Sequence, residues 1–87
     1  FGGIVVGMDQ QQKIILEIKN KLQKGDEMEI ILPDKIQPYV FHIEQLWDIE
    51  TDEPIDYVNP GRANQKVKLE LPIPVEEGYI IRRKKTK

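Results

Sequence analysis

The sequence predicts an all-β domain, folded as a compact, partly open antiparallel β-barrel of six to seven short strands. Apolar and polar residues alternate along most of the chain, which is the period of strands with one buried and one solvated face. Clusters of turn-forming residues separate these segments at intervals of about ten residues. Because 87 residues suffice for one domain, we expect residues 1–87 to form a single unit.

The expected strands follow one another from the glycine-rich opening of the chain. The first includes residues 1–6, and the next three span residues 13–19, 27–32 and 39–44. Residues 66–71 alternate most strictly, with lysine and glutamate on one face and apolar side chains on the other. A short strand from Tyr79 to Arg82 ends the series. The residues expected to face the core are Ile14, Leu16, Ile18, Met28, Ile30, Leu32, Tyr39, Phe41, Ile43, Val67, Leu69 and Leu71.

Turn signals lie between these strands, at residues 9–12, 23–26, 33–35 and 59–61. Pro72 and Pro74 exclude regular central-strand pairing around Ile73, because neither nitrogen can donate a hydrogen bond. The spacing of residues 43, 46 and 47 also fits one helical turn. The strands could stack as two sheets, but a barrel removes exposed edges, and the glycines at 2, 3, 7 and 25 suit its bends and bulges.

Composition excludes several kinds of chemistry. The chain has no cysteine and no serine, so it can hold no disulfide and no cysteine or serine nucleophile. Its single histidine, His42, is expected on the outward face of a strand. The longest apolar runs have three residues, too few to span a membrane. We therefore expect no catalytic residue and no membrane partner, and the lack of cysteine fits a cytoplasmic location.

No cofactor or metal site is expected. Residues 48–56 carry five acids and no base, and Asp48, Glu50 and Asp52 have the spacing of a calcium loop. That loop also needs a glycine at its sixth position and a glutamate at its twelfth, where this sequence has Glu53 and Asn59. A solvated acidic hairpin is the expected structure. The glycines near the N-terminus lack the lysine and serine or threonine of a phosphate-binding loop.

Basic residues provide the candidate binding site. The net charge is −2, but residues 82–87 hold five bases and no acid. Such a run is usually a solvated tail, and the alternative is a contact with the phosphates of RNA. We assign the candidate contact to Lys19, Lys21, Lys24, Arg82, Arg83, Lys84 and Lys85.

One segment is more specific than the rest. Asn20, Lys21 and Leu22 are followed by a Gly25-Asp26 turn of the kind common in translation-factor-like barrels, and then by Glu29 and Pro33. With the glycine-bearing first strand, Asn59-Pro60 and the closing Ile81-Arg82-Arg83, this order resembles the C-terminal domain of the collagenase-like peptidases, family thirty-two of the peptidases of unknown catalytic type.

The resemblance implies an accessory domain that follows a larger catalytic domain in the same chain. Its role would be to position a protein substrate or to stabilise the catalytic domain, and we expect the isolated domain to be monomeric. The alternative is an RNA-contacting domain, because relatives of the family are linked to RNA hydroxylation. Some of those relatives bind iron–sulfur clusters through cysteines, which have no counterpart here. A free-standing regulatory binding module is a third hypothesis.

Overall fold

The structure is a computed structural model that describes residues 2–61 and 65–84, and these residues form ten strands and no helix. Seven strands have three or more residues, which agrees with the expected six to seven. They are β1 (Gly3–Met8), β2 (Ile14–Ile18), β4 (Glu27–Ile31), β5 (Tyr39–His42), β6 (Leu46–Asp48), β9 (Lys66–Leu69) and β10 (Ile80–Arg83). Three further strands have two residues each: β3 (Leu22–Gln23), β7 (Pro54–Ile55) and β8 (Tyr57–Val58).

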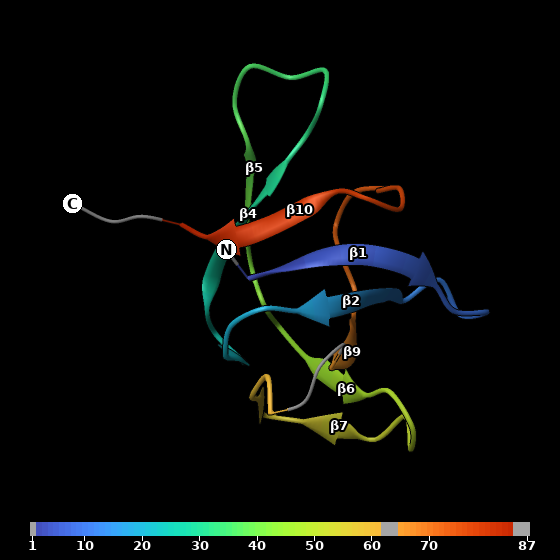
Figure 1. Cartoon of the computed structure of the whole chain (residues 1–87). Coiled ribbons are helices and arrows are strands. Elements are labelled where there is room, and N and C mark those ends of the chain that lie inside the picture. The colour runs from blue at the N-terminus through green and yellow to red at the C-terminus, as the bar shows by residue number, and fades with distance from the viewer. Residues whose placement is uncertain (1, 62–64, 85–87) are drawn as a thin grey trace.

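Eight strands form one antiparallel sheet in the order β5-β4-β10-β1-β2-β9-β6-β7, and β3 pairs with β8 in a separate ladder. The last strand, β10, lies between β4 and β1, near the middle of the sheet (Figure 1). The described part of the chain contains no helix that could cross a membrane.

The sheet curls because of a short connection. Only residues 43–45 join β5 to β6, although five strands lie between them in the sheet. Six steps of about 4.8 Å would separate these strands by roughly 29 Å in a flat sheet. The connection from His42 to Leu46 can span at most about 14 Å. The sheet therefore has to bend into the curled half-barrel that the alternation pattern predicted (Figure 1).

The prediction of a possible helical turn at residues 43–47 is wrong. Residues 43–45 have no regular structure, and β6 begins at Leu46. Leu46 pairs with Leu69 on one side and with Ile55 on the other. Because strand partners on both sides compete for the backbone groups that a helical turn would use, the helical spacing does not decide the local structure.

The core lies inside the curl and contains most of the side chains that the alternation assigned to it. Tyr39 remains 37% exposed, and Leu32 and Leu71 are half-buried where their strands have already ended. The buried apolar residues are Val5, Ile14, Leu16, Ile18, Leu22, Met28, Ile30, Phe41, Ile43, Leu46, Val67, Leu69, Val75 and Ile81.

Glycine is required at two positions for different structural reasons. A Cβ atom on Gly3 would lie 2.6 Å from the carbonyl oxygen of Glu17, so only glycine lets β1 approach β2 this closely. Gly25 has a φ of +94° in the turn between β3 and β4, as the Gly-Asp signal predicted. In that turn the Asp26 carboxylate accepts a hydrogen bond from the Gln23 N–H at 3.0 Å. The expected β-bulge is also present, between Val5 and Gly7.

Leu69→Ala tests the register of β9. Leu69 is 1% exposed and faces the core between Ile14 and Leu46, so its truncation should lower the free energy of unfolding by about 2–5 kcal/mol. Urea unfolding measures the loss, with Ile36→Ala on a fully exposed side chain as the control. A loss below about 0.5 kcal/mol would mean that the register is wrong.

Gly25→Val tests the turn. No atom lies within 4 Å of a Cβ at Gly25, so the cost comes from the positive φ, about 1–2 kcal/mol plus the stiffness of a β-branched side chain. Gly7→Val is the matched control, because Gly7 also has free space but no positive φ. In thermal unfolding, the melting temperature should fall for Gly25→Val and should fall less for Gly25→Asn. Equal stability of the two valine variants would contradict the strained turn.

Candidate functional site

The structure brings some of the predicted basic residues together. Arg83, on β10, donates from Nη2 to the carbonyl oxygen of Lys21 at 3.0 Å. Lys24 follows in the next turn, and its N–H donates to the carbonyl oxygen of Asp56. Lys84 directly follows β10, whereas Lys85 lies outside the described residues.

Carboxylates neutralise several of these cations. Arg82 Nε lies 2.8 Å from Glu29 Oε1, and Arg83 Nη1 lies 3.2 Å from Asp26 Oδ2. Lys19 Nζ lies 3.0 Å from Glu17 Oε1. An incoming phosphate would have to compete with each of these carboxylates. Three of the seven candidate residues, Lys19, Arg82 and Arg83, are therefore paired with carboxylates in the structure.

The acidic segment forms the expected hairpin, from β6 through a turn to β7. The Asp48 carboxylate accepts hydrogen bonds from the N–H groups of Glu50 and Thr51, at 2.8 and 3.0 Å. Within residues 2–61 and 65–84 there is no group of three potential metal ligands. His42 is exposed, as predicted, with Nε2 3.9 Å from Glu27 Oε2.

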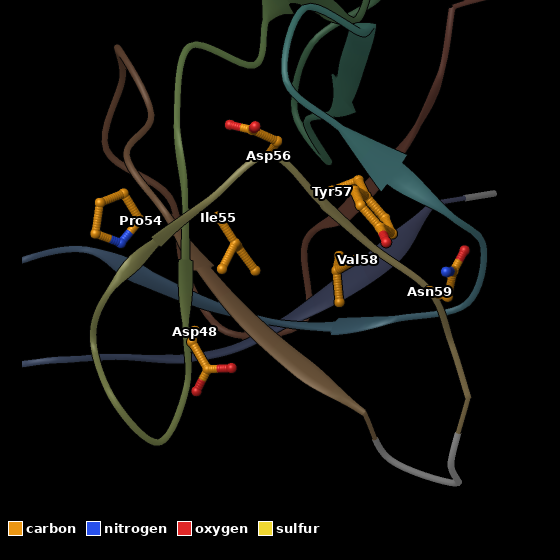
Figure 2. A pocket seen from close by; sticks show the side chains of 7 residues that line it. All are labelled: Asp48, Pro54, Ile55, Asp56, Tyr57, Val58 and Asn59. Carbon is orange, nitrogen blue, oxygen red and sulfur yellow. The ribbon is translucent and has the colours of Figure 1, made fainter.

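A shallow hollow lies beside this hairpin (Figure 2). Its lining comes from Asp48 on β6, from the residues of β7 and β8, and from Asp56 and Asn59. Figure 2 shows Asp48 and Asp56 on opposite sides of Ile55. Because Asp48 holds the hairpin turn and Asp56 stands apart from it, the hollow offers no converging set of polar groups.

Lys68 forms an ion-pair cluster that the alternation pattern did not reveal. From the outer face of β9, its Nζ lies 3.2 Å from Asp9 Oδ2 and 3.2 Å from Asp52 Oδ1. Asp9 belongs to the β1–β2 turn and Asp52 to the β6–β7 turn, so one cation joins two hairpins. The side chains of Lys68 and Asp9 are each only 14% exposed.

This cluster shifts two pKa values. The hydrogen bonds to Asp9 and then to Asp52 raise the pKa of Lys68 above its ordinary value of 10.5. Burial acts to raise the pKa of Asp9, but hydrogen bonds from the Lys13 N–H, Lys68 and the Gln11 N–H outweigh it. The pKa of Asp9 therefore falls below its ordinary value of 3.8. Both charged forms are favoured at neutral pH.

A second hollow, which we call the seam groove, is more enclosed than the hollow of Figure 2. It has a volume of about 520 Å³ and runs along β5. Glu44 and Gln45 of the short connection also line it, and Trp47, Glu70 and Pro72 complete its lining. No local sequence pattern indicates that Trp47 and Glu70 line a hollow together with β5.

Three isoleucines form a row across the outer face of the sheet. The register places Ile80 of β10 directly between Ile4 of β1 and Ile31 of β4. Their sequence neighbours Val5, Ile30 and Ile81 are buried in the core, so the three isoleucines point away from it. Ile80 is 38% exposed, and Ile4 and Ile31 are half-buried. We refer to Ile4, Ile31 and Ile80 as the isoleucine row.

Lys68→Met should lower stability most at neutral pH. The contribution of Asp9 is complete above its ordinary pKa and is lost as the pH falls through its lowered pKa. The contribution of Lys68 is complete below 10.5 and is lost as the pH rises through its raised pKa. Urea unfolding should be measured at neutral pH and at a pH below the pKa of Asp9. The loss of unfolding free energy caused by Lys68→Met should be smaller at the acidic pH.

Lys66→Met is the matched control, because Lys66 shares the outer face of β9 and none of the ion pairs among the described residues involves it. A cost of Lys68→Met that does not change with pH would contradict the ion-pair role.

Comparisons with known proteins agree with this fold and with the resemblance of the sequence. Residues 1–82 match the family described as Peptidase family U32 C-terminal domain. The crystal structure of the C-terminal domain of a protein from Geobacillus thermoleovorans, assigned to the U32 peptidases, is 27% identical. It covers 98% of this chain and 92% of its own, with a TM-score of 0.81.

The selenomethionine variant of that domain is also 27% identical, covering 95% of this chain and 98% of its own with a TM-score of 0.78. No curated protein matches the chain. The match over residues 1–82, together with the shared half-barrel, shows that this chain belongs to the family of U32 peptidase C-terminal domains.

Proposed function

We propose that this chain is a non-catalytic accessory domain of a collagenase-like peptidase, which packs against the preceding catalytic domain and helps to position a protein substrate. The family description supports a C-terminal place in a larger protein, as in the relative from Geobacillus thermoleovorans. A single domain spanning residues 1–87 and a cytoplasmic location, which the lack of cysteine favours, belong to the same proposal.

The isoleucine row is the observation that carries the packing proposal. Three neighbouring β-branched side chains on the outside of a small sheet are the kind of surface that a partner covers. Ile4 follows Phe1 by three residues, and three residues of extended chain span about 10 Å. A domain joined before Phe1 would therefore lie close to the row without a long linker.

The contacts of the carboxylates among the described residues support the proposal that this domain is non-catalytic. Asp9, Asp26 and Asp48 hold turns, and Glu29 pairs with Arg82 across two strands. Each of these carboxylates has a structural partner, and none lies beside a hydroxyl nucleophile and a base in the arrangement that acyl transfer needs. The RNA alternative gains no support, since three of its seven candidate cations, Lys19, Arg82 and Arg83, are paired with carboxylates.

Ile80→Thr tests the packing proposal while keeping a β-branched side chain in the strand. In the parent protein it should lower the free energy of unfolding by roughly 1–2 kcal/mol more than in the isolated chain, because only the parent buries Ile80. Thermal and urea unfolding of the parent and of the 87-residue chain provide the comparison.

Ile36→Thr is the control, since Ile36 is fully exposed in the β4–β5 loop. It should cost the same in the parent and in the isolated chain. An equal cost of Ile80→Thr in both proteins would mean that the catalytic domain does not cover the isoleucine row.

A further inference from the structure

The strand β5 is an edge of the main sheet, and it lacks two of the features that often protect an edge. It pairs with β4 on one side only. Its four residues, Tyr39 to His42, contain no lysine and no proline. The opposite edge, β7, has two residues and begins with Pro54, which cannot donate to a new strand. The two edges therefore differ in their capacity to accept another strand.

The seam groove follows the free side of β5. All four residues of β5 line it, although consecutive residues of a strand point to opposite faces. Phe41 is buried and faces the core, whereas Val40 and His42 face outward. A hollow that touches both sets of side chains lies along the edge of the strand, not over one of its faces. Within the described residues, the backbone of β5 makes no hydrogen bond to any segment except β4.

The groove also offers apolar surface beside the strand edge. Its volume is about 520 Å³, and its lining includes Trp47 and Pro72. The Gln45 side chain donates to the carbonyl oxygens of Leu46 and Ile55, both at 3.0 Å, and so fixes part of the lining. Trp47 and Tyr39 offer apolar area to side chains that alternate along an extended peptide.

The charge of the groove is negative. Glu44 and Glu70 line it and are exposed, and neither takes part in the ion pairs found among residues 2–61 and 65–84. Among the described residues that line the groove, His42 is the only cationic group, and it faces Glu27. One further cation lies nearby, because Lys13 Nζ is 4.6 Å from the centre of the Trp47 ring. A partner with lysine or arginine side chains would complement this charge, whereas a nucleic acid phosphate would be repelled.

We propose that the seam groove binds an extended, basic polypeptide segment, which pairs with β5 as an additional strand and places lysine or arginine side chains beside Glu44 and Glu70. This inference rests on the proposed function, because it names the substrate class that the accessory domain presents: unfolded or extended protein with basic side chains. Backbone pairing supplies affinity for any extended sequence, and the two glutamates supply the preference for basic ones.

The test uses fluorescent peptides of about eight residues, long enough to form a strand of ordinary length. A peptide of alternating valine and lysine should bind the 87-residue chain, and one of alternating valine and glutamate should bind much more weakly. In the double variant Glu44→Lys, Glu70→Lys the affinity for the lysine peptide should fall at least about tenfold, because attraction becomes repulsion. The double variant Glu76→Lys, Glu77→Lys, on two exposed glutamates outside the groove, is the matched control, because it changes the net charge by the same amount.

Strand pairing itself is tested with two N-methylated versions of the lysine peptide, methylated on alternate amides. Only one of these two sets of amides can face β5, so one version should lose binding and the other should keep it. Hydrogen exchange of the amides of residues 39–42 should slow in the complex.

Equal loss or equal retention for the two methylated peptides would overturn strand addition. Binding that Glu44→Lys, Glu70→Lys leaves unchanged would overturn the assigned groove, as would an RNA oligonucleotide that displaces the peptide from it. These outcomes are distinct from a failure of the proposed function, which is read from Ile80→Thr in the parent protein. Ile80 lies outside the groove, so a failure of the groove proposal can be distinguished from a failure of the proposed function.

Discussion

The three-residue connection between β5 and β6 is the constraint on which the rest of the structure depends. It joins strands that are first and seventh in an eight-stranded sheet, and it is too short to do so unless the sheet bends. Bending turns one face of every strand inward and makes a core possible in 87 residues. It also leaves the curl incomplete beside β5, which is why the groove and the free strand edge occur together.

Much of the fold could be predicted from the alternation of residue types. Ile14, Leu16 and Ile18 are buried, as their spacing indicated, because a strand with one solvated face must alternate. The two-residue strands β3, β7 and β8 could not be predicted, since so short a segment carries no period. Their pairing depends on tertiary contacts: β3 meets β8 across more than thirty residues of chain, as the pairing of Leu22 with Val58 shows.

The candidate site was predicted less well, because charge along a sequence does not reveal partners across a sheet. Arg82 and Glu29 are 53 residues apart but are direct cross-strand neighbours. The ion pairs of Arg82 and Arg83 therefore could not be foreseen from composition. The seam groove combines β5, the connection after it and the segment that follows β9. Only the topology brings these segments together, so no local pattern marked them as one site.

The central place of β10 has a consequence for biosynthesis. This strand joins the β5–β4 pair to the five remaining strands of the sheet, yet among the ten described strands it is the last to be translated. Until residues 80–83 are available, the nascent chain has two unpaired strand edges, on β4 and on β1, where the finished sheet has none. The complete sheet can form only after those residues leave the ribosome, and the partly made sheet needs protection from aggregation in the meantime.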